Sequence, residues 1–271
     1  MSVAAAEAAF RAGDPLGALS ALQLEVRQRP QEAKLRLFLS QLLMVLGQWE
    51  RAQNQLRVVA ELDAGALPMA RTYDTAIQCE RLRAEIFAGR RSPLIFGEPD
   101  PWLALLIQAL ALRQPEQAAQ AATLRAQAFE QAAAASGSIN GARFEWLADA
   151  DSRLGPVLEV LLNGAYYWVP MTRIAQVHIE APSDIRDLVW LPASFQWSNG
   201  GEAMGLIPTR YPGTERAGEP QLLLARRTQW SALGDDQYSG LGQRLLASEA
   251  EEYGLLDVRA ILFEAAAVAA A

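Results

Sequence analysis

The sequence predicts an α+β protein in which a tetratricopeptide-like array of helical hairpins is followed by a mostly antiparallel β domain with short helices. Residues 2–135 are rich in Ala, Leu, Gln, Glu and Arg, which favour helices, and their apolar residues recur every three or four positions. Near residue 138 this pattern gives way to short apolar runs that are bounded by Gly, Pro, Asn or Asp. We therefore expect two domains, residues 1–136 and residues 137–271.

The helical half contains a repeat. Gly13 and Gly47 lie 34 residues apart, and an alanine and a leucine follow both glycines at the same two distances. This offset is the tetratricopeptide period, in which a glycine opens the turn between two antiparallel helices. Trp49, two residues after the second glycine, stands where that repeat commonly carries an aromatic residue. The register is lost after residue 64, and we then expect a long helix and a hairpin, over residues 66–88, 100–112 and 115–134.

The β half is predicted from short runs of apolar, aromatic and β-branched residues. These runs are residues 143–149, 156–162, 165–170, 174–180, 187–197, 202–212 and 221–230. Asn199-Gly200 separates two of them and predicts a tight hairpin. The Ala-rich stretch 264–271 is expected to be a frayed terminal helix.

Composition excludes several classes of protein. The net charge of -7 and the pI of about 4.9 leave no excess of Lys and Arg for a nucleic-acid surface. The longest apolar run, residues 103–112, is half the roughly 20 residues that a membrane span needs, so we expect no membrane insertion. The N-terminus lacks the basic region of a secretory signal. A single cysteine, Cys79, fits a reducing compartment, and we expect a cytoplasmic protein with an inert, buried thiol.

Catalytic and cofactor motifs are missing from the sequence. His178 is the one histidine, and it alternates with Val177 and Ile179 on the polar face of a predicted strand. A Ser-His-Asp or Cys-His arrangement would depend on it, and no G-x-S-x-G elbow accompanies it. One histidine and one cysteine do not make a zinc site, and no phosphate-binding glycine loop is present. We therefore predict no catalytic residue, no cofactor and no metal.

Asp149 and Asp151 are the residues that most resemble a chemical site. Two aspartates in a loop can hold a hard cation, act as an acid–base pair or form an interaction surface. They also fix turns, because their side chains accept backbone N–H bonds. The later positions of a calcium loop are not acidic here, and Arg153 and Arg186 are available as bidentate partners. We favour a structural turn with an ion pair, and keep a carboxylate-based hydrolase or metal enzyme as the alternative.

Long strings in both halves resemble one protein family. In the β half they are FEWLADADSRLGPVLE, NGAYYWVP, DLVWLPA, GGEAMGLIPTRYPGTE and GLGQRLL, and in the helical half LRLFLSQLLMVLGQWERA and AEIFAGRRSPLIFGEPDPWLALL. In order and spacing they resemble the ImpE/TagJ family, accessory proteins of bacterial type VI secretion systems. The resemblance covers nearly the whole chain.

The resemblance implies a cytoplasmic, non-enzymatic adaptor. Such a protein would bind the N-terminal helix of the small subunit of the contractile sheath. It would thereby be linked to sheath assembly or to recycling by the AAA+ unfoldase of the system. The alternative hypothesis for its function is a purely architectural scaffold of the secretion apparatus.

The resemblance assigns no binding residues, so the predicted partner surface comes from geometry. The first helix of each tetratricopeptide pair lines a concave face, in which an amphipathic helix can lie. Side chains expected there, or on the long helix beside it, are Leu37, Gln41, Met44, Tyr73 and Ile77. The competing location is the aromatic and Pro-rich surface of the β half, at Tyr167 and Tyr211. The sequence leaves open which surface binds, the oligomeric state and the step of the secretion cycle.

Overall fold

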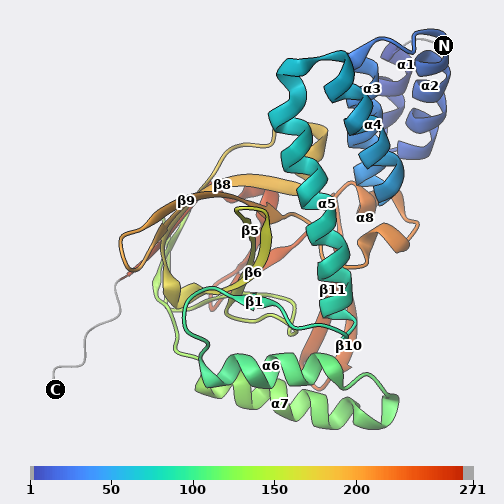
Figure 1. The fold of residues 1–271 in the computed structure, drawn as a ribbon. Helices are drawn as coiled ribbons and strands as arrows, with labels where there is room; N and C mark the ends of the chain where they lie inside the picture. The colour runs from blue at the N-terminus through green and yellow to red at the C-terminus, as the bar shows by residue number, and fades with distance from the viewer. Residues whose placement is uncertain (1–2, 265–271) are drawn as a thin grey trace.

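The computed structural model describes residues 3–264, and the terminal helix expected over 264–271 lies outside them except for Glu264. Helices fill the first half of the chain, as predicted (Figure 1). They are α1 Val3–Arg11, α2 Pro15–Gln28, α3 Ala33–Val45, α4 Trp49–Leu62, α5 Leu67–Phe87, α6 Pro101–Ala111 and α7 Ala118–Gln131. The short 3-10 turns η1 Ala64–Ala66 and η2 Pro115–Gln117 precede α5 and α7.

The predicted repeat corresponds to two helical hairpins, α1–α2 and α3–α4. Gly13 and Gly47 occupy the two turns with φ of +87° and +67°, a left-handed conformation that glycine adopts without steric cost. Asp14 then starts α2, because its Oδ1 accepts the N–H of Gly17 at 2.7 Å and Pro15 supplies a preset first helical residue. The turn residues that define the period therefore also define the helix boundaries.

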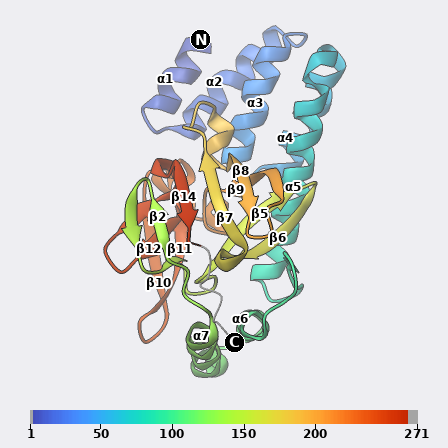
Figure 2. The ribbon, with the colours of Figure 1, turned by 90° about the vertical axis from the view of Figure 1, so that its left-hand side faces the viewer.

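A strongly curved nine-stranded sheet forms the β half, in the order β1-β6-β5-β9-β8-β7-β14-β2-β3 (Figures 1 and 2). Its strands are β1 Leu94–Ile95, β2 Gly137–Ile139, β3 Ala142–Phe144, β5 Val157–Leu162, β6 Ala165–Pro170, β7 Ile174–Ile179, β8 Trp190–Trp197, β9 Glu202–Pro208 and β14 Ala260–Phe263. All pairings are antiparallel except that of β1 with β6. The β8–β9 hairpin turns at Asn199-Gly200, as predicted.

Two smaller sheets complete the β half. The strands β10 Thr228–Gly234 and β11 Gln237–Gly242 form a hairpin, and β4 Leu147–Asp149 lies at the edge of a three-stranded sheet with β12 Leu245–Ser248 and β13 Glu252–Gly254. Short helical turns connect the strands. They are η3 Met171–Arg173, η4 Ile185–Leu188, η5 Thr214–Arg216, α8 Pro220–Leu223 and η6 Leu255–Asp257.

Several local predictions were wrong. The run 143–149 was expected to be one strand, but it is divided between β3 and β4, which lie in different sheets. The run 221–230 was expected to be one strand, but it begins inside α8 and reaches β10 only at Thr228, because Pro220 starts a helical turn at its first position. Strand β1 lies in the half that was predicted to be helical, and it pairs with β6 in the large sheet. The sequence gives no signal for a strand of two residues.

The helical half and the β half pack against each other through a common apolar core. The array of α1–α4 and the α6–α7 hairpin lie at opposite ends of the sheet, and α5 runs between them (Figures 1 and 2). One buried apolar cluster contains residues of α2 to α6 together with Leu161 of β5, Trp168 of β6 and Trp190 of β8. A second cluster lies within the β half. The predicted division at residue 136 coincides with the change from helix to strand, and two independently folding domains remain a prediction. No helix among residues 3–264 is long and apolar enough to cross a membrane.

Candidate functional site

The β half fills the concave face of the helical array. Trp190, at the start of β8, lies with its ring centroid 6.0 Å from those of both Trp49 and Tyr73. Its indole N–H donates to the Glu80 carboxylate on α5 at 3.0 Å. Beside Tyr73, the guanidinium of Arg186 lies over the tyrosine ring at 4.7 Å. The surface that an open array would offer to a partner is therefore covered by the chain itself.

This packing corrects the geometry expected for the predicted partner residues of the array. Met44 is 1% exposed and Ile77 is 0% exposed, Gln41 and Tyr73 are also buried, and Leu37 is half-buried. The prediction rested on tetratricopeptide arrays whose concave face is open. Here η4 packs against α3, Trp190 packs against Tyr73, and Arg210 binds the end of α3, so these five side chains do not form an exposed groove.

The two tyrosines proposed for the β half are also engaged. Tyr211 is buried, and its hydroxyl donates to the carbonyl of Leu245 at 3.2 Å and accepts the N–H of the same residue at 3.0 Å. Tyr167 is half-buried and packs edge-on against Phe96 at 6.2 Å between centroids. Next to Tyr211, Arg210 Nη1 donates to the carbonyls of Val45 and Leu223 at 2.7 and 2.6 Å. The loop that reads as exposed in the sequence thus joins the ends of α3 and α8.

Five buried or nearly buried charges of alternating sign connect α5 to the β half. Glu80 and Arg83 lie on α5, Glu159 on β5, Arg244 before β12 and Asp149 at the end of β4. Arg83 pairs with Glu80 at 3.3 Å and with Glu159 at 2.6 Å, and Arg244 pairs with Glu159 and, at 3.3 Å, with Asp149. Each interior charge faces two of opposite sign, which offsets the cost of burying it.

Asp149 and Asp151 act as turn residues within this region. Asp149 Oδ1 accepts the N–H of Asp151 at 2.8 Å, and Asp151 Oδ1 accepts the N–H of Arg153 at 2.9 Å. The Arg153 guanidinium pairs with Asp151 at 2.5 Å, and the other Asp151 oxygen accepts the N–H of Gly240 at 2.9 Å. Asp149 pairs with Arg244 and not with Arg153 or Arg186, a correction to the expected partners. Arg186 pairs instead with Asp184, at 3.3 Å, because it lies on η4, where its guanidinium also covers the Tyr73 ring.

Burial changes the titration of several of these groups. It raises the pKa of Asp149 to about 7, against the opposing effect of Arg244, and it lowers the pKa of Arg244 to about 10. Asp149 Oδ2 and Arg244 Nε form an ion pair without hydrogen-bond alignment, which leaves the carboxylate poorly compensated.

The Cys79 thiol on α5 is also affected by burial, which raises its pKa to about 11, so the thiol stays protonated and unreactive at neutral pH.

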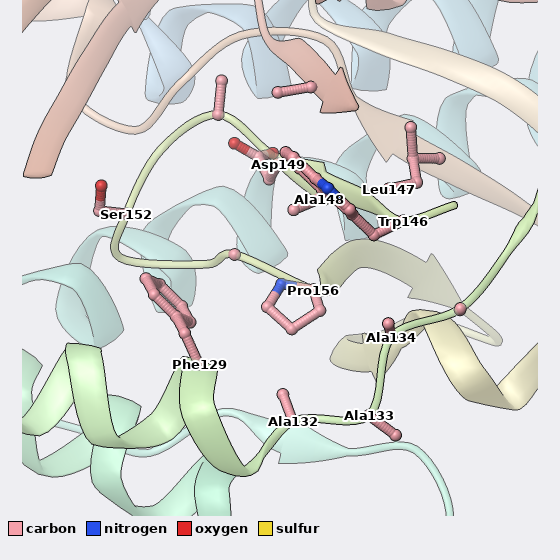
Figure 3. A pocket seen from close by; sticks show the side chains of 14 residues that line it. Phe129, Ala132, Ala133, Ala134, Trp146, Leu147, Ala148, Asp149, Ser152 and Pro156 are labelled. Carbon is pink, nitrogen blue, oxygen red and sulfur yellow. The ribbon is translucent and has the colours of Figure 1, made fainter. Parts of the chain in front are cut away.

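An open apolar groove, which we call the alanine groove, lies between the end of α7, the extended segment 132–135 and β4 (Figure 3). It has a volume of about 420 Å³. Half of its 14 lining residues are alanines, Ala132, Ala133, Ala134, Ala135, Ala148, Ala150 and Ala247. The others are Phe129, Trp146, Leu147, Asp149, Ser152, Gly155 and Pro156.

Trp146 is the largest apolar side chain of this groove that reaches solvent, with 40% of it exposed. Gly155 makes room for the opposite wall, since a Cβ at this position would overlap the Phe129 ring. The sequence analysis did not select any residue of this groove as a binding residue. The sequence shows only a run of four alanines, residues 132–135, and a tryptophan eleven residues after it, and neither indicates that the two lie together in the fold. Among residues 3–264, no group of three or more His, Cys, Asp or Glu side chains is placed to hold a metal ion.

Comparison with known proteins identifies the family. Residues 141–262 match the model of the family described as ImpE protein. The chain is 52% identical over 259 residues to a Pseudomonas aeruginosa protein named type VI secretion system accessory component TagJ, with 96% of this chain and 91% of the relative covered. A crystal structure of protein VPA1032 from Vibrio parahaemolyticus has the same fold, with a TM-score of 0.86, 24% identity and coverage of 96% of this chain and 97% of that one. The resemblance seen in the sequence is confirmed, and the chain belongs to the ImpE/TagJ family of type VI secretion accessory proteins.

Proposed function

We propose that this protein is a non-enzymatic adaptor of a type VI secretion system that binds the N-terminal helix of the small sheath subunit. The observation that carries the proposal is the 52% identity, over 96% of the chain, to a relative named as an accessory component of that system. The adaptor acts in the cytoplasm, where the sheath is assembled and recycled. Any link to the AAA+ unfoldase is indirect, through the sheath subunit.

The engagement of the acidic residues supports a non-enzymatic role. Asp149 and Asp151 accept backbone N–H groups and face Arg244 and Arg153, so both carboxylates are engaged by other groups of the protein. The one histidine, His178, is exposed on β7, whereas the one cysteine, Cys79, is buried on α5, so the two lie on different elements. These positions favour a role in binding over one in catalysis.

The alanine groove supports the binding of a helix. An amphipathic helix is recognised by an apolar depression that accepts side chains from one of its faces. Residues 185–190 pack against α3 and α5 of the helical half, whereas the alanine groove is open and apolar. The adaptor role therefore has a structural candidate for its recognition surface.

Isothermal titration calorimetry tests the adaptor function directly. A peptide that spans the N-terminal helix of the small sheath subunit is titrated into the full chain, and we expect a Kd of about 1 μM or tighter, equivalent to roughly -8 kcal/mol. The control is the same peptide with a proline at its centre, which breaks the helix and should bind at least about tenfold more weakly. Absence of binding by a peptide that is helical, to protein whose circular dichroism is native, would refute the proposal.

A further inference from the structure

We propose that the alanine groove seats the apolar face of the partner's amphipathic helix, with basic residues of that helix facing acidic residues at the rim. The inference rests on the proposed function and assigns its binding surface. Four features of the groove support it: its lining, the state of its strand edge, an exposed aromatic anchor and the charge of its rim.

The lining fits the close approach of a helix. Ala133 and Ala134 are exposed on one wall, and Ala148 is half-exposed on the other. Methyl side chains leave room for the larger apolar side chains of a partner and for its backbone.

The strand edge beside the groove disfavours an extended partner. β4 is an edge strand, because it pairs with β12 alone. Addition of a further strand would need the outward backbone groups of β4, but the N–H of Asp149 already donates to the carbonyl of Gly155 at 2.7 Å. The chain's own loop therefore occupies part of this edge. What remains for a partner is the surface of side chains, which a helix face matches.

Trp146 provides an anchor of the kind that dominates the binding energy of interfaces. Its indole is 40% exposed although it lines an apolar groove. Its backbone is held in place, since the Glu249 carboxylate accepts the N–H groups of Glu145 and Trp146 at 2.9 and 3.4 Å. Because the backbone here is already ordered, covering the indole costs only the freedom of the side chain itself.

The charge of the rim specifies a basic partner. Glu130 follows Phe129 and Glu145 precedes Trp146 in the chain, and Glu249 accepts the N–H of Trp146. All three glutamates are exposed, and within residues 3–264 no Lys or Arg forms an ion pair with them. The N–H of Glu145 lowers the pKa of Glu249, which keeps that carboxylate ionised at neutral pH. A helix with Lys or Arg beside its apolar stripe gains attraction here, and an acidic one is repelled.

The test measures binding of a fluorescently labelled peptide, the N-terminal helix of the small sheath subunit, to full-length variants by fluorescence anisotropy. Trp146→Ala removes the anchor, and Ala134→Trp fills the groove from an exposed position, so both should weaken binding about tenfold or more. Their controls are Met204→Ala and Ala119→Trp, which make similar changes at exposed sites outside the groove and should leave the Kd within about twofold.

Charge is tested separately. Glu145→Lys should weaken binding and reduce its dependence on salt, whereas Glu61→Lys, an exposed charge reversal at the end of α4, should change neither.

If the wild-type protein binds but Trp146→Ala and Ala134→Trp bind equally well, the groove assignment is wrong and the adaptor function stands. If the wild-type protein does not bind, both proposals are wrong. A dimer that Trp146→Ala converts to monomer, with peptide binding unchanged, would place a second copy in the groove and overturn the assignment.

Discussion

Arg244 is the residue that holds the turn at Asp149 and Asp151 against β5. It is completely buried, it faces Asp149 and Glu159, and it connects β4 to β5. The sequence predicted that Asp149 would lie in a turn with an arginine partner, but the partners it indicated were Arg153 and Arg186. Arg244 lies 95 positions beyond Asp149, and only the pairing of β4 with β12 brings the two together. Partners that tertiary structure supplies cannot be chosen from local spacing.

The raised pKa of Asp149 predicts a specific dependence of stability on pH. Between pH 3.8 and about 7 the folded state binds a proton at Asp149 that the unfolded state has lost. Protonation therefore stabilises the fold in this range, and the contribution disappears as the pH rises through 7. We expect the difference in Tm between wild type and Asp149→Asn to be larger, in favour of wild type, at pH 5 than at pH 8.

Thermal unfolding followed by circular dichroism at several pH values measures this difference. Asp235→Asn, which removes an exposed carboxylate from the β10–β11 turn, is the control for the loss of one charge. A difference for Asp149→Asn that stays constant from pH 5 to pH 8 would show that Arg244 outweighs burial and keeps Asp149 ionised in the fold.

The helical hairpins, at the scale of elements, were largely predictable because their signals are local. Two glycines set the turns, and the apolar spacing set the helices, so α2 to α7 lie close to their predicted positions. The filled concave face was not predictable. The stripe that contains Met44 has the same spacing whether it faces a partner or another part of the same chain. The alanine groove was missed for a related reason, since it forms only where segment 132–135 meets β4.

The two repeat glycines make a matched pair for a prediction about stability. Both have positive φ, for which alanine costs roughly 1–2 kcal/mol. At Gly13 a Cβ would lie 3.1 Å from the end of the flexible Arg226 side chain, whereas at Gly47 it would overlap the Cβ of Glu215 near its backbone. We expect Gly47→Ala to lower the free energy of unfolding by more than Gly13→Ala, as measured by urea denaturation. Equal losses would mean that the Glu215 loop moves away without cost.

The whole molecule is held together by contacts across the predicted domain boundary. The cluster that contains Trp190, the charge chain from Glu80 to Asp149, and Arg210 all connect helices to the β half. Removal of one partner of such a buried pair typically costs about 3–5 kcal/mol, because the other charge is left uncompensated. The two halves are therefore expected to depend on each other for stability, although composition divides the chain cleanly into a helical and a β half.

Cooperative unfolding is the corresponding prediction. Five of the seven tryptophans lie after residue 140, whereas the long helices lie before it, so tryptophan fluorescence and circular dichroism at 222 nm report mainly on different halves. In urea we expect the two signals to change in a single coincident transition. Two separated midpoints would instead show that residues 1–136 and 137–271 unfold as independent domains.

Hydrogen exchange of the full chain, with and without saturating peptide from the small sheath subunit, tests most directly that the protein is an adaptor whose recognition surface is the alanine groove. We predict slower exchange in segment 132–135 and around Trp146–Ala148, with the buried array residues of α3 unchanged. Protection of α3 and α4 with the groove unchanged would show that the partner displaces the β half from the concave face. That result, or the absence of any protection, would contradict the binding surface proposed for this protein.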